Sequence, residues 1–263
     1  MSNYCGRLAP TPTGLLHAGH AATFRVAHAR ARAAGGHLLL RIEDIDPDRC
    51  RPEFSTAAIE DLRWLGLDWD GDPIFQSARR EIFLAAWRRL RDGGFIYPSP
   101  HSRREIEQAV GPSDEEEPIF PPEWRQPAGD ALKWDAPAGT NWRFRVPDGE
   151  AITFEDGRCG HVEYVAGRDF GDFVVWRRDD VPAYELAVVA DDIAMGITEV
   201  VRGEDLLLST ARQLLLYRAL NAAPPAFYHC PLVRGSDGRR LAKRDAATGI
   251  RALREAGWRP EDV

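Results

Sequence analysis

Two short motifs near opposite ends of the 263-residue chain carry side chains suited to phosphate chemistry. The first, residues 10–20 (PTPTGLLHAGH), places His17 and His20 about one helical turn apart behind a proline-rich turn. The second is the basic segment 240–244 (RLAKR), which contains Lys243. Imidazole N–H groups and an ammonium group can stabilise negative charge that develops on a reacting phosphate. If the fold brings the motifs together, they frame a polyphosphate from two sides, as the formation of an adenylate from ATP requires.

The first motif lies where a strand is expected to give way to a helix. Residues 5–8 are predicted to form a short strand, and a helix is predicted over about 17–33. A helix that begins there would direct free N–H groups and the positive end of its dipole at an anion. The alternative is that His17 and His20 are ordinary residues of a helix N-terminus. The presence of the distant lysine segment favours the catalytic interpretation.

The segments that follow alternate between strand and helix patterns. Residues 37–43 form an apolar run that is typical of a strand buried on both faces. Apolar residues at helical spacing follow over about 54–65 and 78–91. This order predicts an α/β fold with a doubly wound parallel sheet, in which ligands bind beyond the carboxyl ends of the strands. The pattern resumes late in the chain with a predicted helix at 210–220 and a strand at 227–233.

The middle of the chain interrupts this pattern. Residues 98–140 are rich in proline and acidic groups and are predicted to be an irregular insertion, whereas 141–165 is typical of short antiparallel strands. Three regions are therefore expected. They are residues 1–96, the first half of a nucleotide-binding core; residues 97–172, a small inserted α+β subdomain; and residues 173–263, the second half of the core with the lysine segment.

Composition narrows the setting in which the protein works. The chain has no run of ~18 apolar residues and no basic-then-apolar leader, so neither a membrane span nor secretion is expected. Its four cysteines are scattered, which favours a reducing cytoplasm over a disulfide framework. The net charge of −7 is unfavourable for binding nucleic acid. Arginine pairs such as Arg79-Arg80 allow either a local basic face or simple exposed helix faces.

In combination, these motifs resemble the class I aminoacyl-tRNA synthetases of the glutamyl group. Residues 17–20 (HAGH) and 240–244 (RLAKR) correspond to the two signatures of that family, which are called HIGH and KMSKS. Other matching stretches are 7–14, 40–46, 65–70 and 201–206. The resemblance implies a Rossmann-like class I catalytic core and the ATP-dependent activation of glutamate as glutamyl adenylate, with Mg²⁺.

The length of the chain after the second signature indicates which members it resembles. Only 19 residues follow Arg244, whereas full-length glutamyl-tRNA synthetases continue into a helical region that binds the anticodon. The chain is similar to the paralogues that consist of the catalytic core, which activate L-glutamate without tRNA and attach it to queuosine at the wobble position of tRNA(Asp). The resemblance thus implies L-glutamate, ATP and queuosine-containing tRNA(Asp) as partners; a cytoplasmic monomer without a membrane partner is expected. Alternatives are a glutamyl-tRNA synthetase that charges tRNA(Glu) and a non-catalytic paralogue.

The resemblance also assigns roles to individual residues. Catalysis is assigned to His17, His20 and Lys243; glutamate binding to Arg7, Ala9, Thr11, Glu43, Tyr184 and Arg202; and ATP binding to Pro10, Gly19, His20, Arg240, Lys243 and Arg244. In the glutamate set, Arg7 and Arg202 would face carboxylates and Glu43 the ammonium group, which suits a substrate with two carboxylates and one ammonium. Glutamine would leave a buried arginine unpaired and be rejected.

Three of these assignments have structural alternatives. Glu43 could brace the turn after its strand, and Tyr184 could be a core aromatic at the start of a strand. Arg202 could pair with Glu204 or Asp205 instead of with a substrate.

Two stretches depart from the family pattern. Relatives often bind zinc in the insertion through a Cys-x-Cys pair, a tyrosine and a later cysteine, but here Ser99 and His101 stand at the cysteine positions near Tyr97. Because serine is a poor zinc ligand and one histidine cannot complete a tetrahedral site, no metal site is expected. In the second signature, Arg240 and Ala242 replace the usual lysine and serine. Since Lys243 is retained, activity is expected to persist, with a lowered affinity for ATP as an open alternative.

Overall fold

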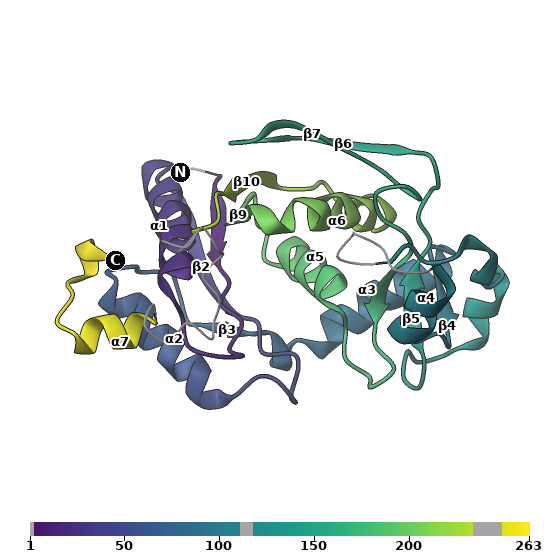
Figure 1. Ribbon diagram of the computed structural model, residues 1–263, viewed down its shortest axis with the longest axis horizontal. Helices are drawn as coiled ribbons and strands as arrows, with labels where there is room; N and C mark the ends of the chain where they lie inside the picture. Colours follow the sequence, from purple (N-terminus) through teal and green to yellow (C-terminus); the bar gives the residue numbers. More distant parts are fainter. Residues whose placement is uncertain (1–2, 111–117, 234–248) are drawn as a thin grey trace.

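The structure is a computed structural model that describes residues 3–110, 118–233 and 249–263. The first half of the chain forms a three-stranded parallel sheet with two helices (Figure 1). Its elements are β1 (Cys5–Leu8), α1 (Ala18–Ala33), β2 (His37–Ile42), α2 (Pro52–Trp64) and β3 (Ile74–Phe75). β1 pairs with β2 from Cys5 opposite His37, and β2 pairs with β3 from Arg41 opposite Ile74. The helix and strands predicted in this region are confirmed to within a few residues.

The second half of the chain returns to the other side of β1. β9 (Glu199–Gly203) and β10 (Ala226–Cys230) are parallel neighbours joined by α6 (Leu207–Ala219). Just before β9, the Thr198 N–H donates to Cys5 O, and the Cys5 N–H donates to Thr198 Oγ1, each at 2.8 Å. These bonds place β9 alongside β1, so the strands run in the order β3, β2, β1, β9, β10. The strand order reverses between β1 and β9, which confirms the doubly wound α/β fold.

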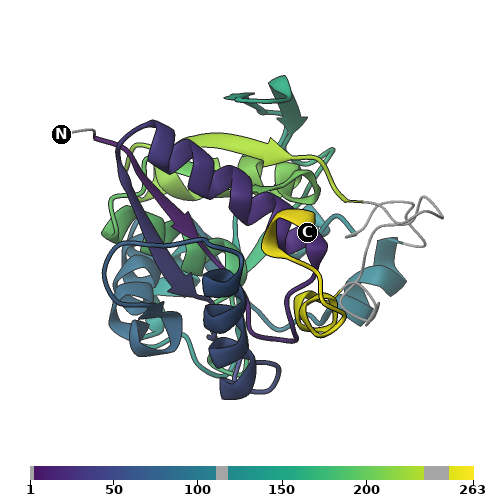
Figure 2. The same ribbon diagram turned by 90° about the vertical axis from the view of Figure 1, so that its left-hand side faces the viewer.

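An apolar core holds the first half together. Phe24 and Ala27 of α1 and Leu62 of α2 are buried in one cluster with Leu8 and Leu40 of β1 and β2. Ile250, the first residue of α7 (Ile250–Glu255), belongs to the same cluster, so the last helix packs against the first half of the fold. Figure 2 shows α7 and the C-terminus beside α1 and α2.

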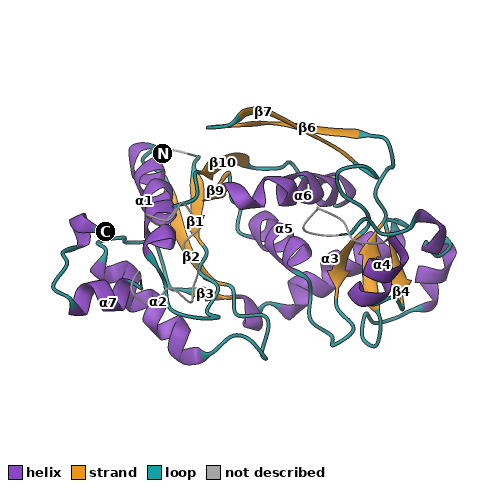
Figure 3. Ribbon diagram, in the orientation of Figure 1, coloured by secondary structure: helices purple, strands orange, loops and turns teal. Residues whose placement is uncertain are grey.

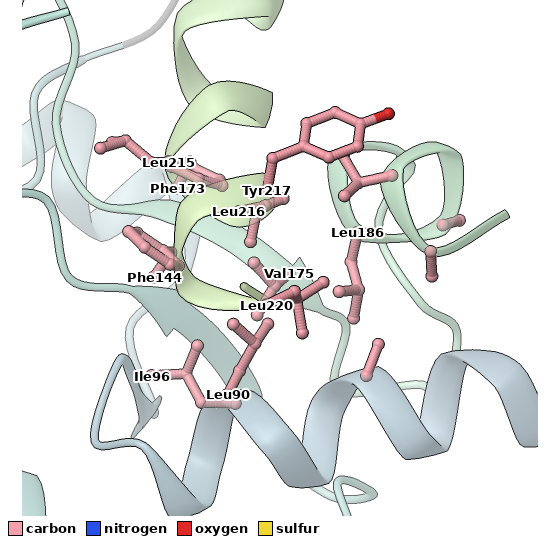
Figure 4. Packing of buried hydrophobic residues seen from close by; sticks show 14 of the residues in the cluster. Leu90, Ile96, Phe144, Phe173, Val175, Leu186, Leu215, Leu216, Tyr217 and Leu220 are labelled. Atoms are coloured by element: carbon pink, nitrogen blue, oxygen red, sulfur yellow. The ribbon is translucent and has the colours of Figure 1, made fainter. Parts of the chain in front are cut away.

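A second sheet lies at the opposite end of the long axis (Figure 3). It consists of the antiparallel strands β4 (Ile96–Ser99), β5 (Asn141–Phe144) and β8 (Phe173–Trp176). Helices α3 (Arg80–Asp92), α5 (Tyr184–Ala194) and α6 pack on it, and Figure 4 shows buried side chains of all three helices meeting those of the sheet. β8 therefore pairs with strands of the insertion, although the sequence places it at the start of the second core half. The three domain limits stay a prediction.

The rest of the insertion differs in part from the expectation of an irregular segment. Residues 103–110 form the helix α4 (Arg103–Val110), and short 3₁₀ turns occur at Pro122–Trp124 and Ala128–Lys133. The antiparallel strands expected within 141–165 are confirmed: β6 (Ala151–Asp156) and β7 (Gly160–Val165) form a hairpin that projects from the body of the protein (Figure 2). β6 joins the main sheet at one point, where Asp156 pairs with Phe227 of β10. Among the described residues, no helix is both long and apolar enough to cross a membrane.

Candidate active site

A cavity of about 340 Å³ lies at the carboxyl ends of β1, β2, β9 and β10, where the strand order of the sheet reverses. This is the place where open parallel sheets bind ligands. The predicted site residues that line it are Arg7, Ala9, Pro10, Thr11, His17, Gly19, His20, Glu43, Tyr184 and Arg202. Every predicted site residue within the described ranges therefore borders this one cavity, although the residues come from segments almost 200 positions apart.

The two histidines form the N-terminal end of α1. His17 is the N-cap residue: its Nδ1 accepts the Gly19 N–H at 3.1 Å, and His20 Nδ1 accepts the His17 N–H at 3.2 Å. The rings lie 3.8 Å apart, and a Cβ at Gly19 would approach the His17 ring to 3.0 Å, so glycine leaves room for it. Since both Nδ1 atoms accept, each neutral ring carries its proton on Nε2, which is the donor that a phosphate oxygen needs. The capping role and the phosphate role are thus compatible.

Arg240, Lys243 and Arg244 lie outside the described residues, but the chain on either side of their segment is described. Val233 lines the cavity with His17 and His20, and its Cβ lies 3.9 Å from the position of a Cβ on Gly19. On the other side, Gly249 forms a β-bridge with His17, and the Ile250 N–H donates to Leu16 O at 2.9 Å. Both described flanks of the lysine segment therefore meet the histidine motif.

Arg202, at the end of β9, is buried against uncharged groups. Within the described ranges, the acceptors of its guanidinium are Gln213 Oε1 at 2.9 Å, Thr210 Oγ1 at 2.6 Å, His229 Nε2 at 3.2 Å, Leu206 O at 3.4 Å and Tyr184 Oη at 3.5 Å. None of these acceptors is a carboxylate, and Glu204 pairs with Arg158 instead. The charge of Arg202 also acts on the buried Glu185, which accepts from Gln213, but no carboxylate of the described residues contacts the guanidinium itself. A carboxylate that entered the cavity would therefore be its direct charged partner.

The first predicted arginine lies in a cluster that already contains carboxylates. Arg7 Nε is 3.6 Å from Asp192 Oδ1 of α5, and the same oxygen accepts from the fully buried Arg41. Arg41 also donates to Glu43 Oε1 at 3.1 Å. Burial would lower the pKa of Arg41, but Asp192 and Glu43 outweigh it and raise that pKa. Of these four residues, Arg7 and Glu43 line the cavity, whereas Arg41 and Asp192 do not.

The positions of Glu43 and Tyr184 can be compared with the purely structural roles that the sequence left open for them. Glu43 Oε2 accepts from Thr11 Oγ1 at 3.2 Å, and its N–H donates to Pro10 O, so it both braces the turns and borders the cavity. Tyr184 is not at the start of a strand: it is the first residue of helix α5 and is 40% exposed. The core-aromatic alternative for Tyr184 is therefore wrong, because its ring faces the cavity.

Comparison with known proteins agrees with this geometry. The family model described as "tRNA synthetases class I (E and Q), catalytic domain" matches residues 5–263. The chain belongs to this family. Its members are ligases that join an amino acid to tRNA, and the Rossmann-like fold and the ligase class expected from the sequence are confirmed.

Individual members of the family are similar over nearly the whole chain. The "Glutamyl-Q tRNA(Asp) synthetase" of Rhodopirellula baltica is 45% identical, with 100% of this chain and 83% of the relative aligned. The "Glutamate--tRNA ligase" of Aquifex aeolicus is 39% identical over 99% of this chain and 56% of its own length. Among solved structures, a glutamate tRNA ligase from Elizabethkingia meningosepticum in complex with its amino acid has a TM-score of 0.83 at 28% identity, with 98% of this chain and 59% of that chain covered.

A larger cavity of about 850 Å³ adjoins the first one. Thr11, Glu43 and Tyr184 line both cavities. The larger cavity extends from the turn after β2, where Asp46 lines it, to the insertion, where His101 lines it. The synthetase core therefore has room for a second, bulkier substrate beside the first.

The insertion positions at which relatives of the family bind zinc do not fit a metal here. Tyr97 Oη donates to Asp172 Oδ2 at 2.6 Å, and the His101 ring stacks on Trp124 with centroids 4.2 Å apart. Arg125 donates to both oxygens of Asp172, so a guanidinium already neutralises the nearest carboxylate. In the part of the chain that the structure describes, no group of three or more His, Cys, Asp or Glu residues could hold a metal ion.

Sequence reasoning missed several residues of the site. Asp192, Thr210, Gln213 and His229 are buried polar residues that hold the predicted arginines in place. His229 stands inside the short, mostly apolar strand β10, whereas the other three lie in helices that carry further polar residues. A polar residue in an apolar element must find a partner, and this was the available signal.

Proposed function

We propose that this chain activates L-glutamate with ATP, without tRNA, and transfers the glutamyl group to queuosine at the wobble position of tRNA(Asp). The proposal is carried by four relatives named Glutamyl-Q tRNA(Asp) synthetase, which are 42 to 46% identical to this chain. Those four alignments cover 96 to 100% of the chain and 78 to 84% of the relatives.

In the activation step, an oxygen of the α-carboxylate of glutamate attacks the α-phosphorus of ATP, and the bond to the pyrophosphate oxygen breaks. His17 and His20 would donate from Nε2 to the oxygens of the phosphorus that becomes crowded and more negative. Lys243 would neutralise the departing pyrophosphate. ATP brings Mg²⁺ bound to its phosphates, and the ion supplies further charge neutralisation when present.

The orientation of glutamate follows from the same step. Because the α-carboxylate must face ATP, the side-chain carboxylate is the one left to pair with Arg202, whose direct acceptors in the described residues are all neutral. Glu43, at the mouth shared by the two cavities, would bind the ammonium group together with Thr11. Ala9 and Pro10 line the same wall without a charge, which leaves the choice of substrate to the arginines.

In the transfer step, a hydroxyl of the cyclopentenediol of queuosine attacks the carbonyl carbon of the adenylate, and the bond to the AMP oxygen breaks. The larger cavity supports this step because it adjoins the glutamate site through Thr11, Glu43 and Tyr184. We propose that the queuosine nucleotide enters there.

We further propose that the protein works in the cytoplasm as a monomer. The free thiols of its four cysteines, two of them buried, suit a reducing compartment. Light scattering coupled to size-exclusion chromatography is expected to give the mass of one chain, and a dimer mass would contradict the monomer.

The transfer assay tests the proposed function directly. The protein, ATP and labelled glutamate are incubated with tRNA(Asp) that contains queuosine, with tRNA(Asp) that lacks it, and with tRNA(Glu). Label is expected only in the first. Label at the 3′ end of tRNA(Glu) would favour the alternative of a glutamyl-tRNA synthetase, and a lack of label in all three would favour a non-catalytic paralogue.

A further inference from the structure

The buried pair of Asp156 and His229 connects the projecting hairpin with the substrate cavity. His229 on β10 is fully buried, and its Nδ1 lies 2.6 Å from Asp156 Oδ2 at the end of β6. Its other ring nitrogen, Nε2, lies 3.2 Å from Arg202 Nε and 3.1 Å from Thr210 Oγ1. His229 does not line the cavity, but it contacts the arginine that does.

The arrangement of donors determines which nitrogen of His229 carries the proton. Arg202 Nε can only donate, so Nε2 must accept and the proton must be on Nδ1. An ionised Asp156 accepts that proton. Burial disfavours the Asp156 carboxylate, but the N–H groups of Cys159 and Arg158 and the contact with His229 outweigh it and lower its pKa to about 2.

We propose that Asp156 and His229 are positioning residues that hold Arg202 in the orientation in which it recognises the glutamate carboxylate. Asp156 selects the tautomer of His229, and His229 accepts from Arg202 Nε. One terminal nitrogen of the guanidinium donates to Gln213 and the other donates to Thr210. Together with the bond from Nε to His229, all three nitrogens of the guanidinium are therefore held. The inference rests on the proposed binding of glutamate, not on the identity of the RNA.

Protonation of His229 would break this arrangement. A proton on Nε2 would remove the acceptor that Arg202 Nε needs. It would also place an N–H donor against the guanidinium of Arg202 and the hydroxyl of Thr210. The other charged groups at His229 are Asp156 and Arg158, whose Nε donates to the His229 carbonyl and which pairs with Glu204. Burial and Arg202 lower the pKa of His229, so the ring stays neutral at physiological pH. Affinity for glutamate is therefore expected to hold through neutral pH and to weaken only when the pH falls below the usual pKa of histidine, through the lowered pKa of His229.

The direct test is calorimetric binding of L-glutamate and of ATP, measured separately on the full chain. Asp156→Asn keeps the shape of the side chain but can donate to Nδ1, which would favour the wrong tautomer. His229→Leu removes the acceptor. Each is expected to raise the Kd for glutamate about 10- to 100-fold, the range for a lost hydrogen bond to a charged group, while the Kd for ATP stays within about twofold.

Two further variants separate positioning from folding. His229→Gln offers an amide oxygen near the position of Nε2 and cannot titrate; it is expected to recover most of the affinity and to abolish its acid dependence. Asp169 follows the same hairpin, and its carboxylate pairs with Arg168. Asp169→Asn is the matched control and should bind glutamate normally.

The outcomes distinguish the inference from the proposed function. An unchanged Kd for glutamate in Asp156→Asn and His229→Leu, or equal losses for glutamate and ATP, would overturn the positioning role. If the wild-type chain binds glutamate with the expected pH dependence but labels no queuosine-containing tRNA, the proposed function fails and the positioning role stands. If the wild type binds no glutamate, both fail.

Discussion

Two buried arginines, on strands that lie on either side of β1, differ in what surrounds them. Arg41 of β2 is fully buried and contacts two carboxylates, Asp192 and Glu43. Arg202 of β9 is also buried, but its described acceptors are a hydroxyl, an amide, an imidazole, a phenol and a carbonyl. The protein thus compensates the charge of Arg41 by itself and leaves that of Arg202 for a ligand.

This difference separates a role in stability from a role in recognition, since Arg202 lines the cavity and Arg41 does not. A self-compensated ion cluster fixes the relative positions of β2 and α5, whereas an arginine held by neutral groups keeps its attraction for an incoming carboxylate. Removal of Arg41 should therefore damage the fold, and removal of Arg202 should damage binding.

The largest expected effect is that of Arg41→Met on stability. The substitution removes the cation that contacts Glu43 and leaves Asp192 with Arg7 alone, 3.6 Å away, which should lower the free energy of unfolding by about 3 to 5 kcal/mol. Urea denaturation monitored by circular dichroism measures it. Arg218→Ala, which removes an exposed pair with Glu150, is the control and should change stability by less than about 1 kcal/mol. Equal stability of Arg41→Met and wild type would contradict the comparison.

Arg202→Leu should have the opposite profile. The kcat/KM for glutamate in ATP–pyrophosphate exchange is expected to fall roughly 10²- to 10³-fold, because a buried charge pair with the substrate is lost. The free energy of unfolding should decrease less than it does for Arg41→Met, since no carboxylate is hydrogen-bonded to Arg202 and the buried Glu185 keeps Arg212 as a cation. A variant that activates glutamate normally would show that Arg202 does not bind the substrate.

Lys243→Ala tests the role assigned to the second signature. We expect an approximately 10²-fold slower activation step, as the loss of one preorganised charge at a leaving group predicts. The chain has one other lysine, Lys133, which is exposed and pairs with Asp130, so Lys133→Ala is a matched control. Normal exchange kinetics in Lys243→Ala would refute the role assigned to the second signature.

Asp61 is a third buried charged group, and its expected effect is smaller. It is a carboxylate with too little positive charge nearby. It is buried, neither oxygen has a hydrogen-bond partner in the described part of the chain, and Arg251 Nε of α7 lies 3.5 Å away. Burial raises its pKa to about 6. The folded state therefore keeps a proton that the unfolded chain releases near pH 4, and stability should fall as the pH rises from 4 to 6.

Asp61→Asn should abolish that part of the pH dependence. Relative to wild type, the variant is expected to gain about 2 kcal/mol in the free energy of unfolding between pH 4 and pH 7. Denaturation curves at these two pH values measure the gain. Parallel pH profiles of the variant and the wild type would mean that Asp61 is ionised or solvated throughout.

The sequence predicted the parts of the molecule whose chemistry is local. The alternation of strands and helices in residues 5–91 led to the parallel sheet, and the turn after β1 led to the histidine motif, because both depend on short-range patterns. Tyr184 was harder to place, since the run YELAVVA is apolar except for Glu185. Such a run fits a buried strand as well as a helix buried on most sides.

The partners of the arginines could not be predicted in the same way. Asp156 and His229 are 73 positions apart and meet only because the hairpin returns to β10. Asp192 reaches Arg41 across 151 positions for a similar reason. Contacts of this kind depend on topology and register, which single-sequence patterns do not contain.

The measurement that tests the central claim most directly is ATP–pyrophosphate exchange in the absence of tRNA, with glutamate and with glutamine. We expect exchange that depends on glutamate and is lower by at least about 10³-fold with glutamine, because an amide cannot compensate the charge of Arg202. Comparable exchange with glutamine, or exchange with glutamate only after tRNA is added, would contradict it.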